Sequence, residues 1–588
     1  SALFGVDHMG PEWIYAWARG GIAFHRADPA QMEQDHMRLD APVQWHPDMV
    51  TPAMIEAAWK TTDDSVLPDD RLMMNGCDYT AAQPLMPEMI ARLNEVDPDK
   101  HREWLHTTMP EFIELFKQKI DRDQLTVIKG ELRDGPAGAT SGNALSTRLY
   151  IKRLNKRAQN MLLRFAEPLG AVAALAGAPY QDVLMRKAWG FLLDAHPHDS
   201  VNGVTQDKTA EDVVNRIQQV IDLSQTLGNR AMQELVRRID CSAFDDNDVL
   251  LIVFNPLPYP RREVVEAWVN MPEQSPRNLD WPPPTSGLQV YDAAGSSCGT
   301  QTEGATSETY CVCELHTRAF PYNCQRYRVF FDTGELPACG YKVFRAAPVA
   351  DVGEHGTAWT TALARTGTLQ TAPNVIENAA LRVAMNPNGS FDLTDKRLGH
   401  TFRALNTYED RGELGDYWIN ARPTCDQVHT SQGCAARIWA EEAGPLQATL
   451  VSEIALRIPQ RGDAAHDRRS DATDELPIRT AVTLRAGAEQ VEVNVAFENR
   501  HEDHYLRAMF PTGLVKATHA DAGGHFHIDR RPIRPQGPSP DSVWPDMATL
   551  PHDRFVDVND GRVGLALLTE GLTEYEVVDT PERTLALS

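Results

Sequence analysis

The hydrophobic pattern in the first quarter of the chain predicts alternating strands and helices. Short apolar runs at 72–74 and 125–128 have the composition of buried parallel strands. Between them, Thr108 and Glu111 have the spacing of a capping box and precede apolar residues at helical intervals. A strand–helix–strand order predicts an α/β domain whose functional groups follow the carboxyl ends of its strands. We place this domain at residues 1–135.

The next stretch, residues 136–243, predicts three amphipathic helices. The first would have Ser146 as its N-cap and would bend or end near Pro168. The second spans about 181–194, and the third begins near Lys208. Apolar side chains recur along one face of each helix, and the connections are short. This pattern predicts an antiparallel three-helix bundle.

From about residue 245 onward the pattern changes to that of β-structure. The apolar run 250–254 ends at an Asn-Pro pair, which favours a turn, and the segment 491–495 alternates with period two. Many short strands separated by Gly and Pro predict stacked β-sandwiches. We divide them into a first β-sandwich region at 244–375 and a large β-sandwich domain at 376–588.

Length and charge narrow the choice of partners. A chain of 588 residues is too long for one core and suggests about three or four domains. Its formal net charge is −25, from 57 Lys and Arg against 82 Asp and Glu, and this charge argues against nucleic acid as a partner. No run of about 18 apolar residues occurs, so we expect no transmembrane helix and no membrane partner. The nine cysteines are odd in number and form no CxxC pair, which favours free thiols and a cytoplasmic location.

One polar cluster lies between the second and third predicted helices, in the sequence His196-Pro197-His198-Asp199-Ser200-Val201-Asn202-Gly203. Imidazole is a common zinc ligand, and a neighbouring carboxylate commonly orients such a site. Judged by spacing alone, the same sequence is also typical of a hydrogen-bonded loop. His196, His198 and Asp199 are therefore candidates for a metal site, with a structural loop as the alternative.

A second candidate residue, Asp78, comes directly after the predicted strand 72–74 and an Asn-Gly pair. In an α/β barrel, a carboxylate just beyond the carboxyl end of a strand lies at the active-site face. An N-cap or a turn-stabilising Asp is the alternative, and the spacing does not choose between them.

A series of motifs along the chain resembles glycoside hydrolase family 38, the class II α-mannosidases, and in particular its bacterial mannosylglycerate hydrolase-like branch. In the first half the similar segments are Asn75-Gly76-Cys77-Asp78, Lys129-Gly130-Glu131-Leu132-Arg133 with Ser146-Thr147-Arg148-Leu149-Tyr150-Ile151-Lys152, and the zinc-histidine loop 196–203. In the second half they are 393–397 with 408–416, then 506–513, and 555–558 with 570–575. The segments follow the family's order through most of the chain.

The resemblance implies a fold and an activity. The expected fold class is multidomain α/β plus all-α plus all-β, with the C-terminal part of a parallel α/β barrel, a three-helix bundle and large β-sandwich domains. The expected activity is that of a retaining, zinc-dependent glycosidase that cleaves terminal α-mannosides, of the α-mannosidase or mannosylglycerate hydrolase type. Such enzymes use one carboxylate as nucleophile and another as acid/base. Its partner would be a mannose-containing glycoside or oligosaccharide.

The resemblance also assigns roles to residues. Asp78 matches the general acid/base, and His198 matches the zinc-binding histidine. Asp199 matches a neighbour that helps to orient metal and sugar, and His196 would support these residues or have a structural role. The implied cofactor is one Zn²⁺ in each active site, with other divalent metals as alternatives. The family's early His-x-Asp motif and its Asp-x-Phe-Gly-His nucleophile motif find no match here. We therefore expect a fragment cut at both ends that does not turn over alone, and we leave open whether it forms a homo-oligomer.

Other histidines give weaker candidates. His46-Pro47-Asp48 has the His-x-Asp spelling, but it precedes a predicted helix, where Asp is common. On a strand, His525, His527 and Asp529 would share one face, which we interpret as solvated, with a metal site as the alternative. The stretch 501–504 predicts a charged surface loop. The alternative functions are a non-catalytic carbohydrate-binding or assembly fragment and a different metal hydrolase that uses His525 and His527.

Overall fold

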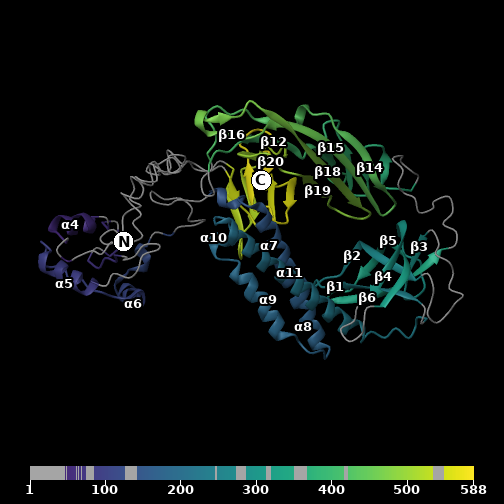
Figure 1. Ribbon diagram of the computed structural model, residues 1–588, viewed down its shortest axis with the longest axis horizontal. Coiled ribbons are helices and arrows are strands. Elements are labelled where there is room, and N and C mark those ends of the chain that lie inside the picture. The colour runs from purple at the N-terminus through teal and green to yellow at the C-terminus, as the bar shows by residue number, and fades with distance from the viewer. Residues whose placement is uncertain are drawn as a thin grey trace. The chain divides into compact units, whose positions relative to one another are not determined.

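The computed structural model describes residues 47, 50–60, 62–63, 65–67, 69–73, 85–125, 127, 142–245, 248–272, 287–312, 320–349, 367–415, 421–533 and 549–588. The chain divides into two compact units, residues 1–140 with 537–546 and residues 141–536 with 547–588. The protein is multidomain, with helices followed by many antiparallel sheets (Figure 1). No helix of the described part is both long and apolar enough to cross a membrane.

The first unit contains three described α-helices: α4 (Pro52–Lys60), α5 (Met86–Val96) and α6 (Met109–Lys119). The capping box predicted at α6 is confirmed, because the Glu111 amide donates to Thr108 Oγ1 and Glu111 Oε2 accepts from the Thr108 amide at 2.9 Å. A small core, with Ile55, Met89 and Leu93 at its centre, joins α4 and α5. A short 3₁₀ helix, η2 (Arg122–Gln124), follows α6.

The strands predicted at 72–74 and 125–128 are not confirmed. Leu72 and Met73 lie in irregular chain, and the Val127 side chain is 78% exposed. The other residues of these two runs, apart from Leu125 in a bend, lie outside the described part. Short apolar runs are ambiguous in sequence because a strand needs a pairing partner that the run itself does not reveal.

The second unit begins with helices that pack on one another. The helix α7 continues through one π-helical turn into α8, and α9 and the 30-residue α11 follow after the short α10. A shared core of Ile151, Ala158, Leu162, Ala188, Leu192, Val213, Ile217 and Val220 joins them. Their bounds are α7 (Leu149–Met161), η4 (Leu162–Ala166), α8 (Glu167–Leu175), α9 (Asp182–Asp194), α10 (His198–Val201) and α11 (Asp207–Val236).

The predicted positions of the second and third helices are confirmed by α9 and α11, whereas the start of the first was wrong. Ser146 lies in a turn, and the N-cap is Arg148, which has a left-handed φ of 47°. Pro168 does not end the helix: it comes two residues after the π-helical turn η4, and α8 continues to Leu175.

The first β-region consists of two three-stranded antiparallel sheets, ordered β1-β6-β3 and β2-β5-β4. Their facing sides bury Val269, Val290, Tyr327, Phe331 and Phe344. The bounds are β1 (Val249–Asn255), β2 (Arg261–Pro272), β3 (Gly287–Asp292), β4 (Thr300–Val312), β5 (Phe320–Leu336) and β6 (Gly340–Val349).

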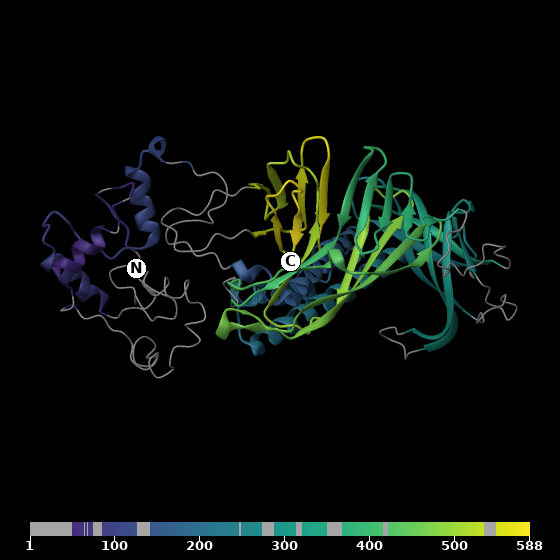
Figure 2. The ribbon, with the colours of Figure 1, turned by 90° about the horizontal axis from the view of Figure 1, so that it is seen from above.

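The remaining strands form four larger antiparallel sheets and one small one around the largest core of the chain. The sheets are β11-β10-β9-β8-β7, β13-β12-β20-β27-β26-β23, β14-β15-β18-β19, β22-β21-β24-β25 and the pair β16-β17. The longest hairpin is β15 with β18, which runs through the green sheet in Figure 2.

The bounds of these strands are, in chain order, β7 (Gln370–Ala372), β8 (Val375–Glu377), β9 (Leu381–Met385), β10 (Phe391–Asp395), β11 (His400–Leu405), β12 (Thr407–Gly412), β13 (His429–Thr430), β14 (Arg437–Ala443), β15 (Gln447–Pro459), β16 (Gly462–Asp463), β17 (Arg468–Arg469), β18 (Thr473–Arg485), β19 (Glu492–Phe497), β20 (His504–Phe510), β21 (His519–Gly523), β22 (Ile528–Pro532), β23 (Leu550–Pro551), β24 (Phe555–Asn559), β25 (Gly564–Leu568), β26 (Glu574–Val577) and β27 (Leu585–Leu587).

Candidate functional site

The histidine loop that the sequence singled out lies between α9 and α11. His198 and Asp199 form the first turn of α10, a helix of only four residues, rather than irregular loop. The His198 side chain is 91% exposed, and its Nε2 lies 3.4 Å from Asp199 Oδ1. His198 and Asp199 are thus an accessible imidazole–carboxylate pair.

His196 faces inward instead. Its Nε2 hydrogen-bonds to Asn155 Oδ1 of α7 at 2.8 Å. Burial lowers the pKa of His196, because removing the imidazole from water disfavours its charged form. His196 therefore ties the loop to α7, and His198 remains at the surface.

Two further residues of α7 hold the far end of the same loop. Arg148 donates from Nε to the Gly203 carbonyl at 3.0 Å and from Nη2 to Asp207 Oδ1 at 2.7 Å. Gly203 has a φ of +82°, and a Cβ there would lie 2.9 Å from Arg148 Cβ, so a side chain does not fit. Lys152 Nζ donates to the Asn202 carbonyl at 2.6 Å and also to the Thr147 carbonyl.

Two of the anchoring residues share one face of the helix. Lys152 and Asn155 have the spacing i and i+3, which places them on one side of α7, and Arg148 precedes them as the N-cap of the helix. Lys152 is only 8% exposed, and burial lowers its pKa to about 8, while the carboxylate of Glu574 acts in the opposite direction. The helix therefore fixes the loop at both of its ends through polar contacts.

The C-terminal strands contact α7 and the turn before it as well. Thr573 Oγ1 donates to the Leu145 carbonyl at 2.6 Å, and Asn160 Nδ2 donates to Glu570 Oε1 at 3.0 Å. Lys156 forms an ion pair with Asp553. The helix thus lies between the histidine loop and the connections around β23–β26.

The structure brings together only part of the predicted site. His196, His198 and Asp199 lie together, whereas Asp78, His46 and Asp48 fall outside the described residues. Within the described ranges, no group of three or more His, Cys, Asp or Glu side chains is placed to hold a metal ion. His198 and Asp199 supply two donors, fewer than the three protein ligands typical of a catalytic zinc site.

The strand interpretation of His525 and His527 was wrong. Both precede β22 and lie in the tight connection from β21, where Phe526 has a φ of 69°. His527 Nε2 bonds to Asp529 Oδ1 at 2.5 Å, and its Nδ1 bonds to the His525 carbonyl oxygen at 2.8 Å. The local turn hydrogen bonds engage this imidazole on both sides.

The prediction of a charged surface loop at 501–504 holds for Glu502 and Asp503, which are exposed and lie outside the strands, but not for His501, which is buried, or for His504, which begins β20. The side chain of His504 is 5% exposed, and its Nδ1 lies 2.5 Å from Oδ2 of the fully buried Asp410. Arg469 Nη2 lies 2.5 Å from the other carboxylate oxygen. Sequence patterns do not reveal this cluster, because its three members lie on three different strands and the outer two, Asp410 and His504, are 94 positions apart.

Comparison with known proteins places this architecture. Residues 376–588 match the family model described as the glycosyl hydrolases family 38 C-terminal domain. A protein of Halalkalibacterium halodurans named "Putative mannosylglycerate hydrolase" is 26% identical over 537 residues, which are 86% of this chain and 57% of that protein.

Two solved structures from Enterococcus faecalis are similar. An alpha-mannosidase from strain V583 has a TM-score of 0.79 at 26% identity and covers 91% of this chain and 62% of its own. A protein in the Glycosyl Hydrolase Family 38 has a TM-score of 0.74 at 25% identity, over 92% of this chain and 63% of its own. The chain therefore spans about three-fifths of the length of these relatives.

Proposed function

We propose, from the match of residues 376–588 to the C-terminal domain of glycosyl hydrolases family 38, that this chain belongs to a glycosidase of that family that cleaves terminal α-mannosides. The observation that carries this proposal is similarity over most of the chain to a structure described as an alpha-mannosidase, with a TM-score of 0.79. The similarity to a protein named as a mannosylglycerate hydrolase supports a mannose-containing glycoside as substrate. Neither relative fixes the linkage or the aglycone.

The proposed chemistry is retaining hydrolysis by two carboxylates. Asp78 is the proposed general acid/base, which protonates the leaving oxygen and later activates water. A second carboxylate must attack the anomeric carbon, and no motif in this chain assigns it. Asp78 as an acid at neutral pH requires a pKa above its ordinary value, for which burial is the usual cause.

We further propose zinc as the metal, with His198 and Asp199 as two of its donors. The exposure of His198 supports this role, because its ring is accessible while His196 is engaged by Asn155. The α7 contacts of Arg148 and Lys152 would position the loop. Further donors would have to come from outside the described residues, which hold no group of three or more His, Cys, Asp or Glu placed for a metal ion.

The division of the chain into domains is also proposed, from the same similarity to the family 38 structures. It comprises the C-terminal part of an α/β barrel at 1–135, a three-helix bundle at 136–243, and β-sandwiches at 244–375 and 376–588. A cytoplasmic location is also proposed, from the cysteine content alone.

Metal analysis and turnover test the proposal together. The purified chain should bind zinc, as measured by elemental analysis after dialysis, and the His198→Ala variant should lose it. His527→Ala is the matched control, because His527 is an accessible histidine whose contacts lie within its own turn, and it should retain the metal. Zinc that depends on His527 instead of His198 would contradict the assignment.

Sugar assays separate hydrolysis from binding. Release of 4-nitrophenol from 4-nitrophenyl α-mannoside, abolished by a chelator and lowered about 10²–10⁴-fold by Asp78→Asn, is the result expected of the hydrolase. Saturable binding of the same mannoside without release, and without zinc, would favour a carbohydrate-binding fragment. One observation favours that alternative: among the described residues, His198 and Asp199 supply only two donors for a metal ion.

A further inference from the structure

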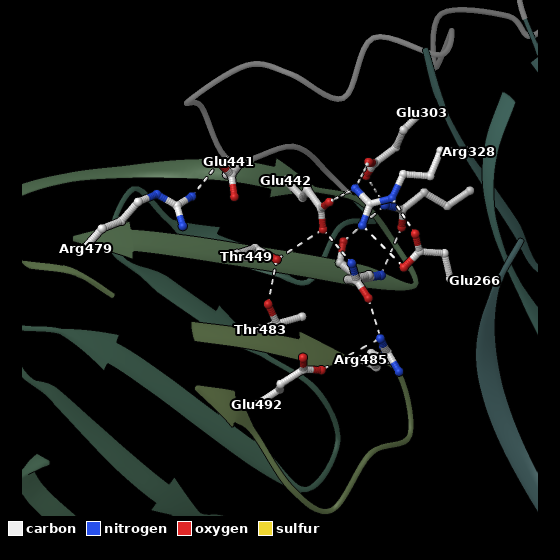
Figure 3. Close-up of polar contacts among 12 residues, drawn as sticks. Glu266, Glu303, Arg328, Glu441, Glu442, Thr449, Arg479, Thr483, Arg485 and Glu492 are labelled. Carbon is white, nitrogen blue, oxygen red and sulfur yellow. Dashed lines mark hydrogen bonds and ion pairs between the residues drawn. The ribbon is translucent and has the colours of Figure 1, made fainter. Parts of the chain in front are cut away.

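A single, partly exposed guanidinium lies among three carboxylates where the first β-region meets the C-terminal domain, residues 376–588 (Figure 3). Arg328 of β5 donates from Nε to Glu266 Oε1 of β2 at 2.9 Å and from Nη1 to Glu303 Oε2 of β4 at 3.2 Å. The same Nη1 donates to Glu442 of β14, which belongs to the C-terminal domain. One positive charge therefore faces three acidic groups from two parts of the chain.

The junction around this cluster is tightly fitted. Gln301 of β4 accepts hydrogen bonds at Oε1 from the backbone amides of Leu446 and Gln447, both at 2.9 Å. A Cβ on Gly444 would lie 2.0 Å from Gln301 Cδ, so only glycine permits the approach. Leu446 packs with Phe330 in the apolar part of the contact.

Glu303 and Glu442 lie close together within this junction, because both carboxylates accept a hydrogen bond from the same Arg328 Nη1. Two ionised carboxylates at such close range repel each other, and a proton on one of them removes the repulsion. Their other contacts are with neutral donors: Gln301 Nε2 donates to Glu303 at 2.8 Å, and Gln447 Nε2 and Thr449 Oγ1 donate to Glu442 at 2.5 and 3.1 Å. The contacts define a close carboxyl pair that spans the two parts.

We propose that the Glu303–Glu442 carboxyl pair is a protonation-controlled latch between the first β-region and the C-terminal domain. With one proton on the pair, Arg328 faces only two negative charges, those of Glu266 and of the remaining carboxylate, and the junction is closed. Without that proton, two carboxylates that share one guanidinium donor face each other and repel. The junction then loosens at the Gln301 contacts, while each part keeps its own core.

The surroundings place the titration near neutral pH. Burial, and next the charge of Glu442, raise the pKa of Glu303 to about 7, and Gln301 and Arg328 only partly oppose them. Among the described residues, the next cation beyond Arg328 is Arg485 of β18. It does not neutralise the carboxyl pair, because it is bonded to Gln447 Oε1 and paired with Glu492 of β19.

The sign of the effect follows from linkage. A carboxyl group whose pKa is higher in the closed junction than in the open one stabilises the closed form below its ordinary value of 4.5. The equilibrium constant for closing the junction therefore falls about tenfold for each pH unit between 4.5 and about 7. Above about pH 7 this stabilisation of the closed form is lost. The latch therefore holds in mildly acidic solution and releases in mildly alkaline solution.

Hydrogen exchange of the Leu446 and Gln447 amides in the intact chain tests the latch. Their protection factors, corrected for intrinsic exchange, should fall on the order of 100-fold between pH 5 and pH 7 and level off above about pH 8. In Glu303→Gln the protection should be independent of pH. In Glu442→Gln the pH range over which the protection factors fall should move to lower pH, because the negative charge beside Glu303 is gone.

Glu266→Gln is the matched control, because Glu266 binds the same Arg328 but is not part of the carboxyl pair. It should keep the steep fall. Constant protection in the wild-type chain from pH 5 to pH 8, or an unchanged slope in Glu303→Gln, would overturn the proposal. So would equal loss of the slope in Glu266→Gln and Glu303→Gln.

Discussion

Replacing Asp410 with Ala should cost more stability than any other single change in the C-terminal domain that we consider. The Asp410 side chain is fully buried and receives Arg469 and His504 at 2.5 Å each. Arg469 is itself only 4% exposed, and its Nε and Nη1 have no other hydrogen-bond partner. Without the carboxylate, the guanidinium remains as an uncompensated buried charge.

The expected size follows from that burial. Removing one partner of a buried ion pair costs about 3–5 kcal/mol, a large share of the roughly 5–15 kcal/mol that stabilises a domain. For a domain of about 200 residues this corresponds to a fall of about 6–20 °C in the melting temperature. Differential scanning calorimetry of the intact chain should show this shift in one transition and leave the others in place.

A second substitution separates the charge from the packing. Adding Arg469→Met to Asp410→Ala removes the stranded guanidinium, so the double variant should be more stable than Asp410→Ala alone. Arg457→Ala serves as a control, because Arg457 and its carboxylate partner Glu475 are both exposed. A loss of less than 1 kcal/mol in Asp410→Ala, or no recovery in the double variant, would refute the reasoning.

Three further predictions concern the helices. Gly228→Ala should destabilise the helical region by about 1–3 kcal/mol, because the new Cβ would lie 2.1 Å from Phe165 Cε1, and Phe165→Leu in the same chain should restore part of the loss in thermal unfolding. Lys152→Met should raise the exchange rates of the amides at 202–204 at least tenfold relative to Asn160→Ala, a control on the same helix; equal rates in the two variants would rule out the anchoring role. Since burial lowers the pKa of Lys152 to about 8, the unfolded chain binds more protons above that pH, and wild-type stability should rise between pH 8 and 10 by an increment that Lys152→Met lacks. A pH titration of the urea midpoint of both proteins measures that increment.

Local patterns predicted the helices well because helical spacing and caps are local properties. The stripe at 181–194 became α9, and Thr108 with Glu111 formed the capping box of α6. Ser146 failed as an N-cap because Arg148 takes that place, and it does so through contacts with residues 55 to 59 positions away. No sequence window of helical length contains those partners.

The site was predicted less completely for the same reason. The resemblance identified the loop of His196 and His198, but spacing could not show that one imidazole faces Asn155 and the other faces solvent. His504 read as a surface residue because its neighbours in sequence are charged, yet its carboxylate partner lies 94 positions earlier. When strands far away in the sequence cover a side chain, its burial cannot be inferred from the residues next to it. The role of Asp78 remains a prediction.

The contact between α7 and the C-terminal strands also constrains the order of assembly. Lys156 and Asp553 are 397 positions apart, so during synthesis at about 5–20 residues per second the helix exists for about 20–80 s before its acidic partner is made. Over that interval the helical core around Ile151, Ala158 and Ile217, together with the polar contacts of the histidine loop, holds α7 in place. The helices must therefore be stable enough to wait, with the Lys156 ammonium in water, until Asp553 is made and pairs with it.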